Sequence, residues 1–278
     1  MTGRSEGRLS RALWISGGKV SSSVQGKAII VTGAGRGIGA AIARELAEGG
    51  ASVCIADLDF ASAQKIAAGI GGAAIAVQVD VSSRDSVKAM IAATVKAFGK
   101  LDVIFNNAGI SQACPFMEVT EHDWHRIMDV NALGVLIGTQ EAARQMQAQG
   151  HGGKIINTAS IAAKQGYPLF AHYCASKFAV AALTQAAARA LAADKITVNA
   201  FAPGVVGTEL WKQLDQEFME HGLTQKPDQA INEFSQSILL GRHSMPGDIV
   251  GVTTFLASTG SDYITGQTFM VDGGMVLI

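Results

Sequence analysis

Tyr173 and Lys177 are the residues whose types and spacing most clearly point to chemistry. Positions four apart lie on one helix face, with Cβ atoms about 5–6 Å apart. An ammonium that close favours the phenolate and lowers the pKa of a tyrosine from about 10. We therefore expect a tyrosine that exchanges a proton with a substrate hydroxyl near neutral pH. For an isolated pair, a core-edge tyrosine beside a solvated lysine is the alternative.

A glycine-rich segment, Thr-Gly-Ala-Gly-Arg-Gly-Ile-Gly at residues 32–39, could hold a phosphate group. It follows a short apolar run and opens an alanine-rich helical stretch. Glycines in such a turn let the backbone approach a pyrophosphate, whose charge lies at the helix N-terminus. Any turn between a strand and a helix can use glycine, but the order of strand, turn and helix favours a dinucleotide site.

Asp57 lies 24 residues after Gly33, at the end of the second expected strand. A carboxylate there can accept hydrogen bonds from both ribose hydroxyls of NAD, and it repels the 2′-phosphate of NADP. Arg36 argues the other way, because a guanidinium in the turn could meet that phosphate. Asp59 is the alternative carboxylate. We expect NAD rather than NADP.

Two further strand ends carry residues suited to a cofactor. Asp80 and the Val81 backbone follow the third expected strand and could contact an adenine. Asn107, Ala108 and Gly109 follow the fourth, where a dinucleotide crosses the carboxyl edge of a parallel sheet. Asn107 could equally be a turn residue whose side chain bonds nearby backbone.

These residues need a framework of alternating strands and helices. Hydrophobic patterning predicts strands over residues 28–32, 52–56, 74–79, 101–106, 154–158, 197–201 and 267–271. It predicts helices over residues 38–49, 60–70, 83–98, 123–149, 173–193 and 248–256. We expect an α/β fold: a single Rossmann-type, doubly wound parallel sheet of about seven strands with helices on both faces.

The chain divides into an extension and one domain. Residues 1–25 show no periodic apolar face and are expected to form a flexible extension, and residues 26–278 are expected to form a single dinucleotide-binding domain. Residues 204–246 are the one long irregular stretch, expected to act as a substrate-binding lid. Its apolar positions at helical spacing are Trp211, Leu214, Phe218 and Met219, and its polar members Glu209, Gln213 and His221 suit a hydroxylated substrate.

Composition excludes several classes of partner. The chain has 278 residues, a net charge of −1 and a pI of about 6.6. There is no basic field to hold nucleic acid or an anionic membrane, and no apolar run of the roughly 18–20 residues that a span needs. Cys54, Cys114 and Cys174 form no disulfide or metal pattern, so we expect reduced thiols, a cytoplasmic protein and no catalytic metal.

Several motifs occur together in one order and make the chain similar to a known family. They are the glycine turn at 32–39, Asn-Asn-Ala-Gly at 106–109, Asn131, Ser160, the pair Tyr173 and Lys177, and Pro203-Gly204. Ser160 precedes Tyr173 by 13 residues. From about residue 26 to 278 the chain resembles the short-chain dehydrogenase/reductase family.

The resemblance implies a role for each matching position. Tyr173 would be the catalytic acid or base, and Lys177 would lower its pKa and bind the nicotinamide ribose. Ser160 would bond the substrate oxygen, and Asn131 would hold a water in a proton relay and stabilise its helix. The implied cofactor contacts are the turn residues Gly33, Arg36, Gly37, Ile38 and Gly39, then Asp57, Asp80, Val81, Asn107, Ala108 and Gly109, then Pro203, Gly204, Val206 and Thr208 around the nicotinamide.

The resemblance also implies a reaction: reversible oxidation of a secondary alcohol to a ketone with NAD, with a small hydroxylated or carbonyl substrate. Within the family, residues 152–157 and 262–267 and the Trp211 loop resemble the acetoin/2,3-butanediol and the sugar-alcohol dehydrogenases. The family suggests a homotetramer. The alternatives are an NADP-dependent reductase of a 3-oxoacyl or hydroxysteroid substrate, and a dinucleotide-binding sensor without turnover.

Overall fold

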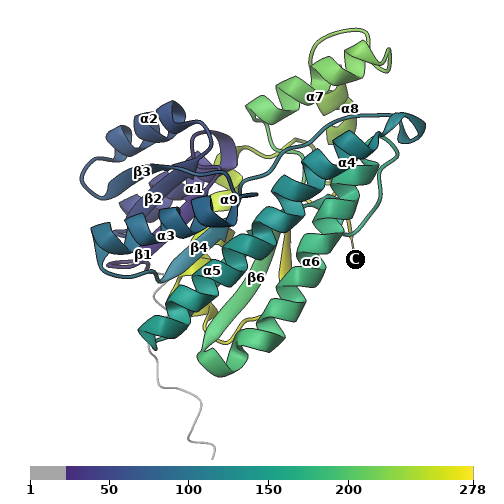
Figure 1. The fold of residues 1–278 in the computed structure, drawn as a ribbon. Coiled ribbons are helices and arrows are strands. Elements are labelled where there is room, and N and C mark those ends of the chain that lie inside the picture. Colours follow the sequence, from purple (N-terminus) through teal and green to yellow (C-terminus); the bar gives the residue numbers. More distant parts are fainter. Residues whose placement is uncertain (1–22, 278) are drawn as a thin grey trace, which may run out of the picture.

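A computed structural model describes residues 23–277 of the chain. Its centre is a seven-stranded sheet in the order β3-β2-β1-β4-β5-β6-β7, in which all neighbours pair in parallel (Figure 1). The strands are β1 Ala28–Thr32, β2 Ser52–Asp57, β3 Ala74–Gln78, β4 Val103–Asn106, β5 Gly153–Thr158, β6 Ile196–Pro203 and β7 Thr268–Val271. The expected fold class is confirmed, with strand bounds that differ by one or two residues.

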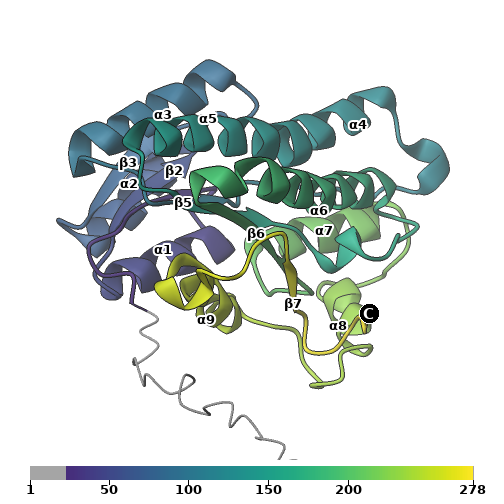
Figure 2. The ribbon, with the colours of Figure 1, turned by 90° about the horizontal axis from the view of Figure 1, so that it is seen from below.

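Helices cover both faces of the sheet, as expected for strands that are apolar on both sides. Ile42 of α1 and Ile249 of α9 belong to one buried cluster, while Met90 of α3 and Met146 of α5 belong to another. Figure 2 shows α1 and α9 on one side of the sheet and α3, α5 and α6 on the other. The helices are α1 Gly37–Glu48, α2 Phe60–Ile70, α3 Arg84–Phe98, α4 Glu121–Met128, α5 Gly134–Gln149, α6 Ala171–Leu191, α7 Glu209–Glu220, α8 Gln229–Ser235 and α9 Pro246–Ala257.

The expected helix over residues 123–149 is divided. It begins at Glu121, because Thr120 and Asp123 form a reciprocal capping box, and a π-helical turn, Asp129–Leu133, separates α4 from α5. Such turns insert an extra residue into a helix and are frequent at functional sites. Asn131 lies in this turn and is fully buried.

The expectation of an irregular stretch over residues 204–246 is wrong, because this segment contains α7 and α8. Leu214 and Phe218 of α7 are buried, as their helical spacing predicts. The buried carboxylate of Asp215 accepts hydrogen bonds from the amides of Asp228 (2.6 Å) and Ala230 (3.0 Å) at the start of α8. The Asp215 side chain of α7 thus caps the N-terminus of α8 and links the two helices.

The N-terminal extension expected over residues 1–25 lies outside the described residues except for its end. There Val24 is buried and belongs to the cluster that contains α1. Within residues 23–277, no helix is both long enough and apolar enough to cross a membrane.

Candidate active site

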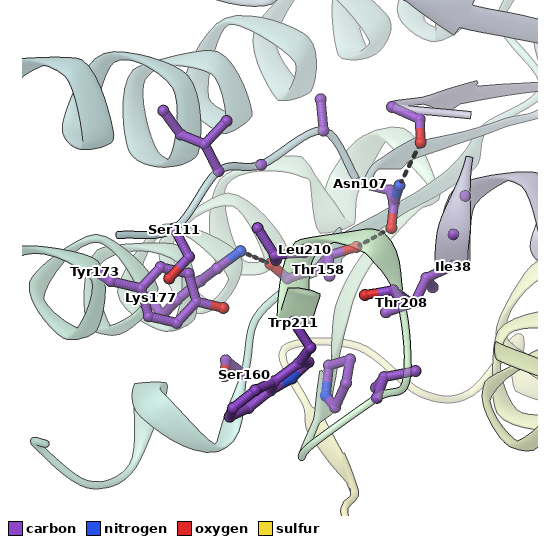
Figure 3. Close-up of a pocket in the computed structure, with 18 of the residues that line it drawn as sticks. Ile38, Asn107, Ser111, Thr158, Ser160, Tyr173, Lys177, Thr208, Leu210 and Trp211 are labelled. Atoms are coloured by element: carbon purple, nitrogen blue, oxygen red, sulfur yellow. Dashed lines mark hydrogen bonds between the residues drawn. The ribbon is translucent and has the colours of Figure 1, made fainter. Parts of the chain in front are cut away.

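The carboxyl ends of the parallel strands open into a cavity of about 410 Å³ (Figure 3). Its lining includes Ser160 and every residue that the sequence suggested for cofactor contact: Gly33, Arg36, Gly37, Ile38, Gly39, Asp57, Asp80, Val81, Asn107, Ala108, Gly109, Tyr173, Lys177, Pro203, Gly204, Val206 and Thr208. Asn131 does not line it, and neither do His221, suggested for the substrate, and Asp59, the alternative carboxylate. The sheet topology alone brings these segments together, since ligands of such folds bind beyond the carboxyl ends of the strands.

The glycine turn between β1 and α1 has no room for side chains. A Cβ at Gly39 would lie 2.2 Å from the Gly33 carbonyl oxygen, and one at Gly33 would lie 2.8 Å from Ala108 Cα. Gly37 needs its glycine for another reason, a φ of +55°. No side chain caps the first turn of α1 in the part of the chain described. Its amides are therefore available to an anion such as a pyrophosphate.

Asp57 and Asp59 have different hydrogen-bond partners. The Asp57 carboxylate accepts a hydrogen bond from the Gly35 amide at 2.8 Å and lines the cavity. Asp59 instead caps α2, accepting from the Ser62 amide at 3.1 Å and from the Ser62 hydroxyl at 2.6 Å. Because Asp59 is used as a helix cap, Asp57 is the carboxylate of the two that lines the cavity at this edge of the sheet.

Asn107 braces the turn in addition to lining the cavity. Its amide nitrogen donates to the Thr32 carbonyl at 2.9 Å and to the Gly33 carbonyl at 3.3 Å. Its oxygen accepts from the Thr158 hydroxyl at 3.2 Å, at the end of β5. Asn107 thus ties the ends of β1, β4 and β5 to one another, which fixes the shape of the glycine turn.

Tyr173 and Lys177 lie one turn apart on α6 and face the same cavity (Figure 3). The Lys177 ammonium donates to the Thr158 carbonyl at 2.8 Å and lies 5.6 Å from the centroid of the Tyr173 ring. Lys177 is almost wholly buried. The pairing predicted from their spacing is therefore present, with β5 holding the lysine in place.

The expected lowering of the pKa of Tyr173 is not found in the protein by itself. Burial raises this pKa to about 12, and the Ser160 hydroxyl lowers it by a smaller amount. Burial also lowers the pKa of Lys177 from 10.5 to about 8. The expectation treated the lysine as a nearby charge and neglected the cost of removing both groups from water. At neutral pH Tyr173 is thus protonated.

Ser160 and Asn131, the other two suggested catalytic residues, differ in their positions. Ser160 begins the short turn Ile161–Ala163 after β5, and its hydroxyl accepts from the Ala162 amide at 3.2 Å. Asn131 lies behind the cavity wall, where its side chain bonds both the amide and the carbonyl of Ile110 at 2.9 Å. A Cβ added to Gly109 would be 3.2 Å from Asn131 Oδ1 and 3.6 Å from Lys177 Nζ. Asn131 therefore holds the loop after β4.

Aromatic side chains form a wall at the far end of the cavity. Of these, the sequence suggested only Trp211. Trp211 packs edge-on against Phe234, with ring centroids 5.5 Å apart, and Phe170 packs against Tyr173 at 6.3 Å. Trp211, Phe234 and Phe170 line the cavity, and so do Tyr167 and Ser111. No short motif contains these residues. Ser111 could have been suggested from its place, two residues after Asn-Asn-Ala-Gly.

Other reactive side chains take no part in the cavity. The thiol of Cys174 is buried, which raises its pKa, and its sulfur accepts a hydrogen bond from the Tyr167 amide at 3.3 Å. His221 ends α7 and lies 3.7 Å from Glu118. His172 is fully buried, and burial lowers its pKa. Across residues 23–277, no three His, Cys, Asp or Glu side chains are grouped as metal ligands would be.

Comparison with known proteins agrees with this geometry. Residues 33–276 match the family model described as enoyl-(acyl carrier protein) reductase. The chain is 44% identical to L-2,3-butanediol dehydrogenase of Corynebacterium glutamicum over 256 residues, which are 90% of this chain and 98% of that protein. It is 43% identical to galactitol 2-dehydrogenase of Agrobacterium fabrum over 249 residues, which are 89% and 96% of the two chains.

Among solved structures, the fold matches that of 3-ketoacyl-(acyl-carrier-protein) reductase from Brucella melitensis complexed with NADH. The TM-score is 0.83 at 36% identity, over 92% of this chain and 100% of that chain. A short-chain type dehydrogenase/reductase from Mycobacterium marinum matches with the same TM-score at 35% identity, over 92% of this chain and 98% of the other. With the glycine turn, the Ser160, Tyr173 and Lys177 cluster and these relatives, the chain belongs to the short-chain dehydrogenase/reductase family of oxidoreductases.

Proposed function

We propose that this protein is an NAD-dependent oxidoreductase that interconverts a secondary alcohol and a ketone on a small polyol, acetoin or 2,3-butanediol. One observation carries the proposal: a single cavity is bounded at one end by the glycine turn and at the other by Ser160, Tyr173 and Lys177. A protein that only sensed the dinucleotide would not need a buried lysine beside a half-buried tyrosine, since both lose solvation there.

The residues present fit a dinucleotide. The uncapped first turn of α1 and the side-chain-free surface of Gly33 and Gly39 suit a pyrophosphate, and Asp57 and Thr208 lie along the same cavity. When bound, the nicotinamide would supply the hydride acceptor for the alcohol carbon, or the donor for the ketone. The protein's part is to bind, to orient and to move the proton.

The proton is assigned to Tyr173. In ketone reduction its hydroxyl, protonated at neutral pH, donates to the carbonyl oxygen, and Ser160 donates to the same oxygen. The Lys177 ammonium, 5.6 Å from the ring centroid, stabilises the phenolate that results. Alcohol oxidation runs the same transfers in reverse. The Thr158 carbonyl, 2.8 Å from Lys177 Nζ, keeps the lysine at this distance.

Asp57 supports the choice of NAD over NADP. Its carboxylate is at the end of β2, where the adenosine ribose of a dinucleotide lies in folds of this type. A second negative charge on the ribose would face this carboxylate. Arg36, which is exposed, is the one cation of the glycine turn that could offset it.

The substrate class is supported by the cavity and the relatives together. Relatives that cover about nine-tenths of the chain are named for 2,3-butanediol, galactitol and sorbitol, at 44%, 43% and 39% identity. Ser111, Gln213 and the Tyr167 hydroxyl offer polar groups at the substrate end, beside the aromatic wall. This mixture suits a small molecule with more than one oxygen.

We also propose a cytoplasmic homotetramer without nucleic-acid or membrane partners. The near-neutral charge of the chain supports the absence of such partners, and the three cysteines, free and buried, are compatible with a reducing compartment. The oligomeric state rests on the family resemblance.

The test is Tyr173→Phe, with 2,3-butanediol, acetoin, galactitol and sorbitol as substrates and NAD⁺, NADP⁺ and their reduced forms as cofactors. Removing the hydroxyl should lower kcat by about 10²–10⁴-fold, the usual contribution of general acid–base catalysis. NADH binding, followed by fluorescence titration, should stay within a few-fold of wild type. Tyr263→Phe is the matched control, because Tyr263 is fully exposed. Near-wild-type turnover of Tyr173→Phe would contradict the assignment.

A further inference from the structure

The hydroxyl of Ser111 is a buried polar group without a protein partner. Ser111 is 2% exposed and lines the cavity, and its hydroxyl forms no hydrogen bond with any residue in the range 23–277. Buried hydroxyls are normally bonded. Four side-chain atoms in the described chain are unpartnered and sealed from solvent, among them His172 Nδ1, but the Ser111 oxygen is not one of them. The accessible part of the Ser111 oxygen therefore faces the cavity.

The backbone on both sides of Ser111 is fixed. Before it, the Asn131 side chain holds both polar groups of the Ile110 backbone at 2.9 Å. After it, the Ala113 amide donates to the Glu217 carboxylate of α7 at 2.7 Å. The Ser111 hydroxyl is thus presented by a short segment that is anchored to the π-helical turn on one side and to α7 on the other.

The neighbouring Gln112 adds a third anchor. Its side-chain oxygen accepts from Arg126 of α4 at 2.8 Å and lies 3.3 Å from the Nε2 of His172 on α6. The Gln213 amide of α7 also reaches the Ser111 carbonyl at 3.4 Å. A serine on a backbone held this firmly can bind a ligand oxygen without the cost in conformational entropy of ordering the loop.

The surroundings define what that oxygen belongs to. In Figure 3, Ser111 and Ser160 are drawn on opposite sides of the Tyr173 ring, and Trp211 is drawn on the same side as Ser160. Phe170, Trp211 and Phe234 supply apolar contact surface in the same region. The site therefore offers one set of groups for a reacting oxygen, one hydroxyl for another oxygen, and an apolar wall.

We propose that Ser111 is a specificity-determining residue that binds the second oxygen of a short vicinal diol or α-hydroxyketone, while Ser160 and Tyr173 engage the reacting oxygen. The proposal rests on the proposed function and adds the substrate class. A serine hydroxyl can donate or accept, so it serves both the diol and the hydroxyketone. The alkyl end of the substrate packs against the aromatic wall.

The test compares 2,3-butanediol with 2-butanol, which lacks the second hydroxyl, on wild type and Ser111→Ala. We expect kcat/KM for the diol to fall about 3–10-fold in the variant, the worth of one neutral hydrogen bond, and kcat/KM for 2-butanol to stay unchanged. Because the hydroxyl has no protein partner, the variant should melt at the wild-type temperature or above. Ser160→Ala should lower both rates, since it acts on the oxygen that both alcohols share.

The outcomes separate the two proposals. Equal losses for both alcohols in Ser111→Ala, or no loss for either, would overturn the role of Ser111 while leaving the proposed function intact. If the wild type oxidises sorbitol but neither four-carbon alcohol, the proposed function survives and this inference fails. If it oxidises none of these alcohols with NAD⁺ or NADP⁺, both the proposed function and this inference fail.

Discussion

Replacing Lys177 by methionine should stabilise the protein at neutral pH, although it abolishes the proposed chemistry. Lys177 is almost wholly buried, and its ammonium has one hydrogen-bond partner in the described chain, the Thr158 carbonyl at 2.8 Å. Burial lowers its pKa from 10.5 to about 8. The charged form is therefore disfavoured in the folded state relative to the unfolded chain, and methionine removes that cost with a side chain of similar length.

The magnitude follows from the two pKa values. A lowering from 10.5 to about 8 corresponds to about 3 kcal/mol of destabilisation by the charged lysine at pH 7. Loss of the bond to the Thr158 carbonyl, in which the donor is charged, offsets about 1.5–3 kcal/mol of the gain. Between pH 8 and pH 10.5 the unfolded chain binds the proton and the folded protein does not, so wild-type stability rises with pH. The penalty thus shrinks to under about 1 kcal/mol by pH 10.

Urea unfolding of both proteins at pH 7 and pH 10, at one protein concentration, measures the difference. Lys177→Met should be more stable than wild type by up to about 1.5 kcal/mol at pH 7, and equal or less stable at pH 10. Lys164→Met, at an exposed position four residues after Ser160, controls for the loss of a positive charge. A variant that is less stable at pH 7, or whose difference from wild type does not change with pH, would refute the reasoning.

Two further predictions concern catalysis. Since the pKa of Lys177 is about 8, kcat/KM for ketone reduction should fall as pH rises through about 8, because the ammonium is present below that pH and lost above it; a flat profile from pH 7 to 9.5 would contradict its role. Asp57→Asn keeps an acceptor for the Gly35 amide but removes the charge, so the ratio of kcat/KM for NADP⁺ to that for NAD⁺ should rise about tenfold. An unchanged ratio would show that Asp57 does not set the cofactor choice.

The cofactor end of the cavity could be predicted because topology decides it. Once the strands are known to be parallel, residues that follow them, such as Asp57, Asp80 and Asn107, must meet at one edge. The glycine turn was equally predictable, since Gly33 and Gly39 are required by close backbone contacts that any larger residue would prevent.

The substrate end could not be predicted in the same way. Phe170 and Phe234 come from segments far apart in the chain and meet only through the packing of α7 and α8 against α6, with ring centroids 6.2 Å apart. Nothing in the spacing of residues 123–149 signals the π-helical turn that places Asn131 behind the wall. The direction in which the pKa of Tyr173 is shifted also depends on burial, which a four-residue spacing does not encode.

The cavity draws on two portions of the chain: residues up to Gly109 supply the glycine turn and the strand ends beside it, and later segments supply the Tyr173 and Lys177 pair, the loop from Pro203 to Thr208 and the aromatic wall. Natural variation can therefore exchange one portion's side chains while the other stays fixed. Relatives named for a four-carbon diol and a six-carbon polyol have nearly the same overall identity to this chain, 44% and 43%. Positions 111, 167, 211 and 234, which line the cavity in the later portion, are therefore the first to compare among such enzymes.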